Sequence, residues 1–269
     1  MKTILLHIHD DSGLDSRLQA ALDLSEGFGS HIDCIHATPL EEYLKQDPWT
    51  AARLPEEFSD KMKAVRLELK TRVEKRLSIA GASWDWFHVD GLMSSALVRY
   101  SMLSDLILVT LAGYSIEEDE PRALAGPVAL VAGTPVLAVP ENFGRLDIAA
   151  PALIAWNGKP EAAQAMRASL PLLKQAKRVF LLEVEETLAK YPRDRVARYL
   201  SRQGIHVTIV QREATRGAIG DVILQVAGEL GAGFIAMGAY GHSRLKEFIF
   251  GGVTRQLLSE SPIPLLLAH

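Results

Sequence analysis

Two glycine pairs near the end of the chain have the spacing of an anion-binding loop. Gly238 and Gly241 follow a short apolar run, and Gly251 and Gly252 precede a second apolar stretch. Glycine lets a loop turn sharply and lets backbone N–H groups approach a ligand closely. A helix that begins at the second pair would add unpaired N–H groups and the positive end of its dipole. The pattern therefore predicts a phosphate cradle between a strand and a helix.

This spacing resembles a known motif. Gly-x2-Gly-x9-Gly, then a small residue, then Val253 and Thr254, is similar to the nucleotide-binding motif of the universal stress protein family. The family carries Ser or Thr where this chain has Gly252, so the resemblance implies a cradle that lacks one hydroxyl but keeps the backbone N–H and Thr254. The alternative is a glycine loop with a purely structural role.

The resemblance also implies contacts to an adenine base. The family's polar residue after the first strand, usually Asp, corresponds to Asn157, whose amide has the donor and the acceptor that an adenine edge needs. Val184 would contact the base through its backbone. The alternative for Asn157 is a turn residue in Asn-Gly. The nucleotide-binding residues expected from the resemblance are Asn157, Val184, Met237, Gly238, Gly241, His242, Gly251, Gly252, Val253 and Thr254.

The glycine loop lies in the second copy of an internal repeat, whose strands and helices position it. The segment 105–115 aligns with 233–243, and both halves end in a Pro-containing apolar run, 134–139 and 263–268. Further strands are expected at 3–9, 32–37, 84–89, 152–156, 178–184 and 205–211, and helices at 16–25, 56–79, 94–103, 162–173, 194–202, 219–230 and 253–258. Alternating strands and helices predict an α/β fold with parallel sheets covered by helices on both faces.

The resemblance then covers the whole chain as a tandem form. It implies two doubly wound domains, 1–140 and 151–269, each with a five-stranded parallel sheet in the order 3-2-1-4-5. The linker is expected at 140–150. The fifth strands, near Val136 and Leu265, would pair within the chain as an intramolecular pseudo-dimer, which removes two exposed edges. We expect two superposable units related by a pseudo-two-fold axis, and not one continuous sheet.

The first half departs from the motif. Thr110 stands where the second half has Gly238, and the acidic run 117–120 follows. Carboxylates beside a phosphate would repel it, although the run could equally be a solvated loop. Residues 1–144 hold 13 basic and 22 acidic side chains, whereas residues 145–269 hold 16 and 11. We therefore expect at most one nucleotide per chain, in the second half.

Composition limits the class of protein. The chain has 269 residues, 48% of them hydrophobic and 23% charged, which is normal for a globular protein with a core. The single Cys34 excludes an intramolecular disulfide and indicates a cytoplasmic setting. No apolar run approaches the ~20 residues of a membrane span, and the start of the chain is a poor signal peptide. The net charge of −4 argues against nucleic-acid binding.

Other groups of residues give weaker indications of a metal or catalytic site. His7 and His9 share a strand face and His36 lies on the next strand, so three imidazoles could bind zinc or nickel. We favour histidines hydrogen-bonded at strand ends, with no metal. His242-Ser243 lacks the second glycine of a nucleophile elbow, because Leu245 stands there. No Walker motif and no catalytic residue is identified.

The favoured function is a cytoplasmic stress-response protein that binds ATP, ADP or AMP, with or without magnesium, as a sensor or regulator. No general base is evident, so we expect no fast enzymatic turnover. One alternative is a nucleotide-free scaffold. A second is an adenylate-forming enzyme of the same superfamily. The preferred nucleotide, the stress signal, the protein partners and a further homodimer stay open.

Overall fold

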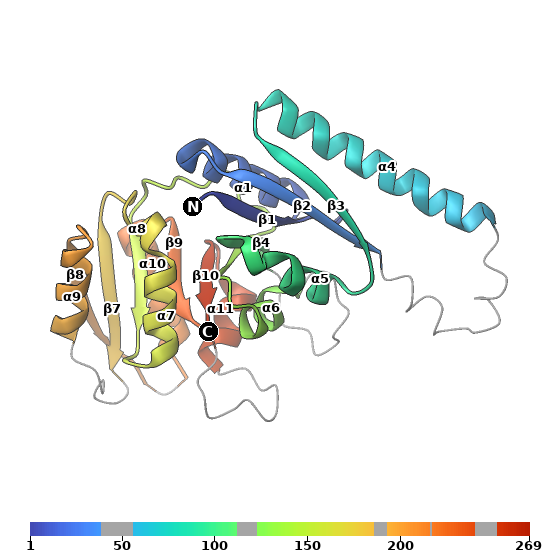
Figure 1. Ribbon diagram of the computed structural model, residues 1–269. Coiled ribbons are helices and arrows are strands. Elements are labelled where there is room, and N and C mark those ends of the chain that lie inside the picture. The colour runs from blue at the N-terminus through green and yellow to red at the C-terminus, as the bar shows by residue number, and fades with distance from the viewer. Residues whose placement is uncertain (39–55, 112–122, 186–192, 216, 240–251) are drawn as a thin grey trace.

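Figure 1 shows the computed structural model of the chain. It describes residues 1–38, 56–111, 123–185, 193–215, 217–239 and 252–269, with the backbone alone for 56–62 and 185. None of the helices in these ranges is both long and apolar enough to cross a membrane.

The first unit alternates strands and helices. Its strands are β1 (Thr3–His7), β2 (His31–Thr38), β3 (Trp84–Asp90), β4 (Leu106–Leu111) and β5 (Val136–Pro140). Its helices are α1 (Leu14–Phe28), α4 (Glu56–Ile79), α5 (Met93–Tyr100), the short 3-10 helix η1 (Ser101–Leu103) and α6 (Ala125–Val131).

The second unit repeats this order. Its strands are β6 (Ala152–Trp156), β7 (Val179–Glu185), β8 (Val207–Glu213), β9 (Phe234–Gly238) and β10 (Leu265–Ala268). Its helices are α7 (Pro160–Ala168), α8 (Leu170–Leu173), α9 (Arg193–Arg202), α10 (Ile219–Leu230) and α11 (Gly252–Glu260). The single helix expected at 162–173 is divided in two, because Pro171 cannot donate the backbone hydrogen bond that would continue it.

The ten strands form one sheet in the order β3-β2-β1-β4-β5-β10-β9-β6-β7-β8. Each unit has the order 3-2-1-4-5 with parallel pairing, and β5 pairs antiparallel with β10. The α/β fold class, the strand order and the pairing of the fifth strands are confirmed. The expectation that the sheet would not be continuous is wrong, because pairing two edge strands necessarily joins their sheets. The domain bounds 1–140 and 151–269 stay a prediction.

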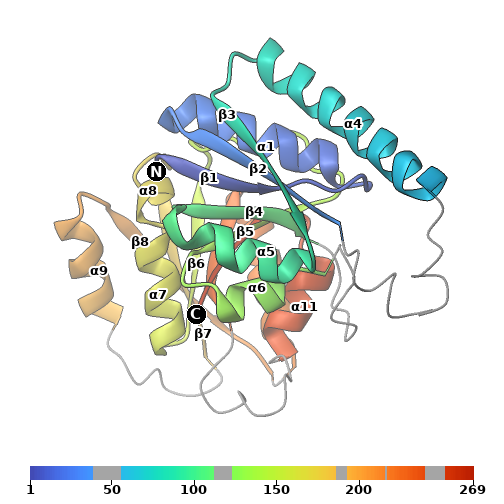
Figure 2. The same ribbon diagram turned by 45° about the vertical axis from the view of Figure 1, so that its right-hand side comes forward.

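Helices cover both faces of the sheet. In Figure 2, α1 and α4 lie along one face of the first unit and α5 and α6 along the other. One apolar core contains residues of α1, α4, α7 and α9, and the second contains residues of α5, α6, α10 and α11. Neighbouring residues of a strand enter opposite cores, as Leu5 and Leu6 do, which explains why the central strands are almost entirely apolar.

The junction between the units is fully apolar. Leu266 of β10 lies opposite Leu137 of β5, and Leu267 lies opposite Val136. All four side chains are buried. The linker is held as well, because buried Asp23 of α1 accepts hydrogen bonds from the backbone N of Leu146 at 2.7 Å and from Arg145 at 2.8 Å. The two units therefore share both apolar cores.

We predict that Leu266→Ala destabilises both units together. Removing this buried side chain should cost about 2–5 kcal/mol, and calorimetry should show a single transition moved to lower temperature. Leu103→Ala is the matched control, because Leu103 is 93% exposed and should change stability by no more than about 0.5 kcal/mol. Two separate transitions, with one unaffected by Leu266→Ala, would show that the junction does not couple the units.

Candidate functional site

The carboxyl ends of β6, β7 and β9 meet at one edge of the sheet. Ala155 of β6 pairs with Met237 of β9, and Trp156 pairs with Glu183 of β7. Asn157 follows Trp156 directly, so it lies at this edge together with the residues that end the neighbouring strands. The expected site residues Asn157, Val184, Met237 and Gly238 are thus brought to one edge. Three others, Gly241, His242 and Gly251, lie outside the described residues.

Asn157 forms a turn. Its Oδ1 accepts a hydrogen bond from the backbone N of Lys159 at 3.1 Å, and Gly158 has a φ of 72°. A positive φ favours glycine, so Asn-Gly is the expected pair for this turn. The turn interpretation is therefore confirmed. The amide nitrogen of Asn157 takes no part in that bond, and the side chain is exposed.

Gly238 has a packing role that sequence reasoning missed. A Cβ at this position would lie 2.6 Å from the backbone N of Ala162 and 2.6 Å from the carbonyl carbon of Glu161. The first turn of α7 therefore approaches the end of β9 so closely that only glycine fits. This requirement explains Gly238 without a ligand, whereas the close approach of backbone N–H groups to an anion stays a prediction.

Helix α11 begins at Gly252. That residue is exposed, and no heavy atom of the described residues lies within 4 Å of where its Cβ would be, so they leave room for a serine there. Thr254 is 7% exposed and Met237 is 5% exposed, so both side chains belong mainly to the interior. Val184 and Val253 are half-buried against the second core. Among these five residues, Gly252 at the start of α11 is the exposed one.

Strand pairing shows which positions of the two units correspond. Ile4 pairs with Leu106 in the first unit, and Ala152 pairs with Phe234 in the second, at matching points of the repeat. Counting from these strands gives four corresponding pairs: Asp11 and Lys159, Gly13 and Glu161, Arg17 and Ala165, and Thr110 and Gly238. In each unit glycine occupies one of the two positions where the helix start meets the fourth strand. A Cβ at Gly13 would collide with Thr110, as one at Gly238 would with Glu161.

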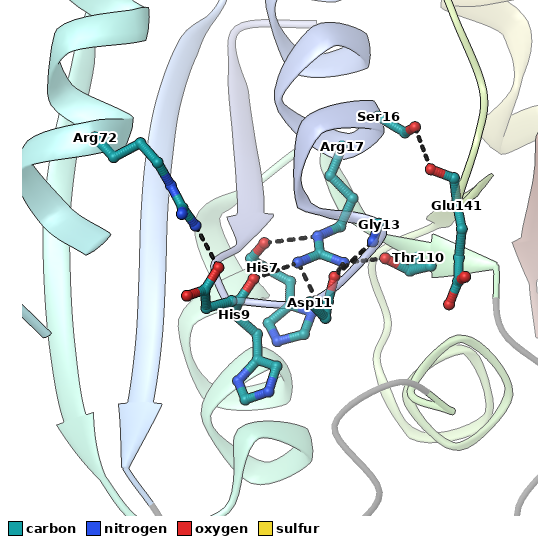
Figure 3. Close-up of polar contacts among 10 residues, drawn as sticks. His7, His9, Asp11, Gly13, Ser16, Arg17, Arg72, Thr110 and Glu141 are labelled. Atoms are coloured by element: carbon teal, nitrogen blue, oxygen red, sulfur yellow. Dashed lines mark hydrogen bonds and ion pairs between the residues drawn. The ribbon is translucent and has the colours of Figure 1, made fainter. Parts of the chain in front are cut away.

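Arg17 bridges the carboxyl ends of β1 and β4 in the first unit (Figure 3). Its Nε donates to the carbonyl oxygen of His7 at 3.0 Å, and its Nη2 donates to that of His9 at 3.0 Å. Its Nη1 donates to the hydroxyl of Thr110 and, at 2.9 Å, to Asp11. The space between β1 and β4 is where the strand order reverses, which is where doubly wound folds bind ligands. In this unit an arginine occupies it.

The Arg17–Asp11 pair is a buried ion pair. The guanidinium is fully buried, and the Asp11 side chain is 2% exposed. Burial lowers the pKa of Arg17 from its ordinary value, and the charge of Asp11 opposes that shift. Asp11 also accepts a hydrogen bond from the backbone N of Gly13 at 2.8 Å. Because Arg17 lies on α1 and its partners come from β1, β4 and the turn after β1, the guanidinium holds α1, β1 and β4 together.

The second unit has no equivalent bridge among these positions. Buried Ala165 stands where Arg17 stands, and Gly238 stands where Thr110 stands. Lys159 replaces Asp11, so the charge at that turn is reversed and exposed. Sequence reasoning identified Thr110 but missed Arg17. The available signal was the single basic residue of the α1 segment, six positions after Asp11.

The three histidines considered as a metal site do not come together. His7 follows the side of β1 that enters the second core, whereas His36 follows the side of β2 that enters the first. His36 stacks on Trp86 and lies 3.2 Å from His88, Nδ1 to Nδ1. His7 stacks on His9, and neither ring nitrogen of His7 has a hydrogen-bond partner in the described part of the chain. The strand-end hydrogen bond is confirmed for His36 and is wrong for His7.

The imidazoles of buried His7 and of half-buried His36 and His88 are neutral at pH 7. Burial lowers the pKa of His7 well below its ordinary value, with the charge of Arg17 as the next cause. Burial also lowers the pKa of His36 to about 4, with His88 adding to the shift. The pKa of His88 is lowered by burial and by Arg66.

Comparisons with known proteins agree with the repeat. The model of the universal stress protein family matches residues 152–269. A universal stress protein from Archaeoglobus fulgidus DSM 4304 superposes with a TM-score of 0.78 at 18% identity, over 99% of this chain and 95% of that one. A functionally unknown protein from Pseudomonas aeruginosa PAO1 gives 0.59 at 16% identity, over 100% and 92%. These identities support the fold alone.

A shorter neighbour matches half of the chain. It is a universal stress protein in complex with cAMP, with a TM-score of 0.40 at 16% identity, over 52% of this chain and 98% of that one. A search of curated proteins found no match. The site must therefore be argued from the residues of this chain.

We predict that Arg17→Ala strongly destabilises the protein. It leaves the buried carboxylate of Asp11 without its cation, which typically costs about 3–5 kcal/mol. Arg72→Ala is the matched control, because Arg72 forms an exposed ion pair with Asp10 that should contribute about 0–1 kcal/mol. Urea denaturation of the two variants measures both. Equal losses would show that the buried pair does not have the special role assigned to it.

Stability should fall as the pH is lowered from about 6.5 towards 4. The folded pKa values of His7, His36 and His88 lie below the unfolded value of about 6.5, so the unfolded chain takes up protons first. Each histidine adds up to about 1.4 kcal/mol per pH unit to the slope of the free energy of unfolding against pH. Urea titrations across this range should show that His7→Leu flattens the slope. The change should also raise stability at pH 7, because it removes an unsatisfied buried imidazole.

His206→Leu is the control for this pH dependence. His206 is exposed and lies in the second unit, so its replacement should leave the slope unchanged. A slope that His7→Leu does not alter would contradict the assignment of a neutral buried imidazole.

Proposed function

We propose that the second unit, in which residues 152–269 match the model of the universal stress protein family, binds one adenine nucleotide, and that the first unit binds none. The nucleotide would lie at the carboxyl edge of β6, β7 and β9. Asn157 and Val184 would contact the base, and the start of α11 would face the phosphates. The glycine residues of the motif would bring further N–H groups to that position.

The contrast between the two strand-order reversals is the observation that carries this proposal. In the first unit Arg17 spans the carboxyl ends of β1 and β4 and is fixed by Asp11 and Thr110. In the second unit Ala165 and Gly238 occupy the corresponding positions and carry no polar side chain. The place where doubly wound folds bind ligands is thus bridged in one unit and not bridged by these residues in the other.

Charge supports the same assignment. The exposed cation of Lys159 stands where the first unit has the carboxylate of Asp11. A cation beside a helix start favours an anionic ligand, and a carboxylate opposes one. The second half also has the excess of basic side chains. We therefore assign the phosphate end of the nucleotide to the side of Lys159 and α11.

We propose a role in sensing or regulation within the cytoplasm. The family resemblance and the lack of an identified general base support binding without fast turnover. Two observations also fit the alternative function, a nucleotide-free scaffold. Packing against α7 explains Gly238, and a turn explains Asn157. Gly252 also lacks the hydroxyl of the family motif. The following measurements separate the two functions.

Calorimetric titration of the wild-type chain with ATP, ADP and AMP, with and without magnesium, should give one site per chain for at least one nucleotide. Lys159→Glu should weaken binding by about tenfold or more, because it removes a charged contact and adds a repulsive one. Lys177→Glu makes the same charge change just before β7, at the opposite edge of the sheet, and should leave affinity nearly unchanged. Wild-type protein that binds no adenine nucleotide would support the scaffold.

The motif glycines give a second test. Gly252→Ser should tighten binding, because the added hydroxyl has room at the start of α11 and can reach an anion there. Gly241→Val and Gly251→Val should abolish binding if their backbones approach the phosphates as proposed. Circular dichroism of each variant checks that the fold is kept. If the Gly252→Ser variant binds the nucleotide more weakly than the wild type, the phosphates do not lie at the start of α11.

A further inference from the structure

Three potential metal ligands converge on the first unit, away from the nucleotide site. His31 is the first residue of β2, and Asp33 follows it on the same face. Asp85 of β3 lies directly beside Asp33 in the parallel register. The ligand atoms of these three side chains all lie within 4.8 Å of one another. They sit towards the amino ends of the strands, whereas the proposed nucleotide site uses carboxyl ends.

We propose that His31, Asp33 and Asp85 form a binding site for a divalent first-row transition metal ion. His31 Nε2 lies 3.4 Å from Asp33 Oδ1 and 3.2 Å from Asp85 Oδ2. In a tetrahedral zinc site with bonds of about 2.0–2.1 Å, neighbouring ligand atoms are about 3.3 Å apart. Both distances from the imidazole nitrogen therefore already have the spacing that a shared metal ion would impose.

A proton on His31 explains these distances less well. A charge-assisted hydrogen bond between an imidazolium and a carboxylate is about 2.7–2.9 Å long, and both observed distances exceed this range. When Nε2 carries the proton, it donates a hydrogen bond to Asp85 Oδ2 at 3.2 Å, which is long for a charged pair, and the contact with Asp33 Oδ1 at 3.4 Å is longer still. A divalent metal ion contacts all three ligand atoms together, so one ion balances the charge of both carboxylates.

The other ring nitrogen of His31 is held in the way typical of a metal ligand. Nδ1 lies 2.7 Å from the hydroxyl oxygen of Ser83. A hydrogen bond from Nδ1–H to this oxygen leaves the Nε2 lone pair directed at Asp33 and Asp85. Such a contact on the second nitrogen fixes the tautomer and the ring orientation of histidines that bind metals.

The position of the Asp33 carboxylate inside the sheet also favours a bound cation. It lies inside β2 between Ile32 and Cys34, with strands on both sides, and its side chain is only 22% exposed. Like charges directly opposite on neighbouring strands are destabilising, so Asp33 beside Asp85 costs stability unless a cation is present. One imidazole nitrogen and two carboxylate oxygens suit zinc, cobalt, manganese or iron better than magnesium, which rarely takes nitrogen. Three protein ligands leave positions for water, because Asp85 is 68% exposed.

The test uses the full-length protein, treated with EDTA and dialysed, with ZnCl2 as the probe. Calorimetry should give one zinc ion per chain bound with micromolar or better affinity, and MgCl2 at the same concentration should not bind. His31→Ala should abolish this site. Asp85→Asn, a nearly isosteric change at an exposed position, should weaken it about tenfold or more, and Ser83→Ala should weaken it about 10–100-fold.

Two histidine variants serve as controls. His206→Ala removes an exposed imidazole in the second unit, and His36→Ala removes the one paired with His88, and neither should change zinc binding. Thermal melts of every variant check the fold. No zinc binding by the wild-type protein would overturn the proposal. So would zinc binding that His36→Ala abolishes and His31→Ala leaves intact.

Discussion

The buried guanidinium of Arg17 constrains what the first unit can do. A fully buried cation must have all its donors paired, and here the partners are a carboxylate, a hydroxyl and two backbone carbonyls from β1, β4 and the turn that follows β1. Those partners lie at the reversal of strand order, so the interaction that stabilises the unit also fills the place where such folds bind ligands. The second unit lacks both charges of this pair, since Ala165 and Lys159 stand in their places.

The antiparallel pairing of β5 with β10 joins the two units, with their different proposed roles, into one stable molecule. Each unit supplies five strands, and neither has an exposed fifth strand, because the two cover each other. The strands that Arg17 bridges, β1 and β4, are connected to the second unit through β5. If the first unit binds no nucleotide, as proposed, it still covers the edge strand β10 of the second unit.

Much of the fold could be predicted from the sequence, because the repeat and the regular alternation of strands and helices fix the class and order of elements. Local packing could not be predicted. The hydroxyl that Arg17 contacts on Thr110 is 93 positions away, and Gly238 is required by a helix that starts far upstream. His36 was expected beside His7 because their strands are neighbours, yet alternation puts them on opposite faces. The gathering of His31, Asp33 and Asp85 likewise depends on register, which the sequence does not reveal.

We propose that one unit of the pair binds the nucleotide while the other is bridged by its own arginine. Photo-crosslinking with 8-azido-ATP, followed by mass spectrometry of the peptides, tests this claim most directly because it locates the base along the chain. Unlabelled ATP should compete with the label, and every labelled peptide should lie within residues 152–269. Competed labelling of peptides from residues 1–140, alone or together with the second unit, would contradict it.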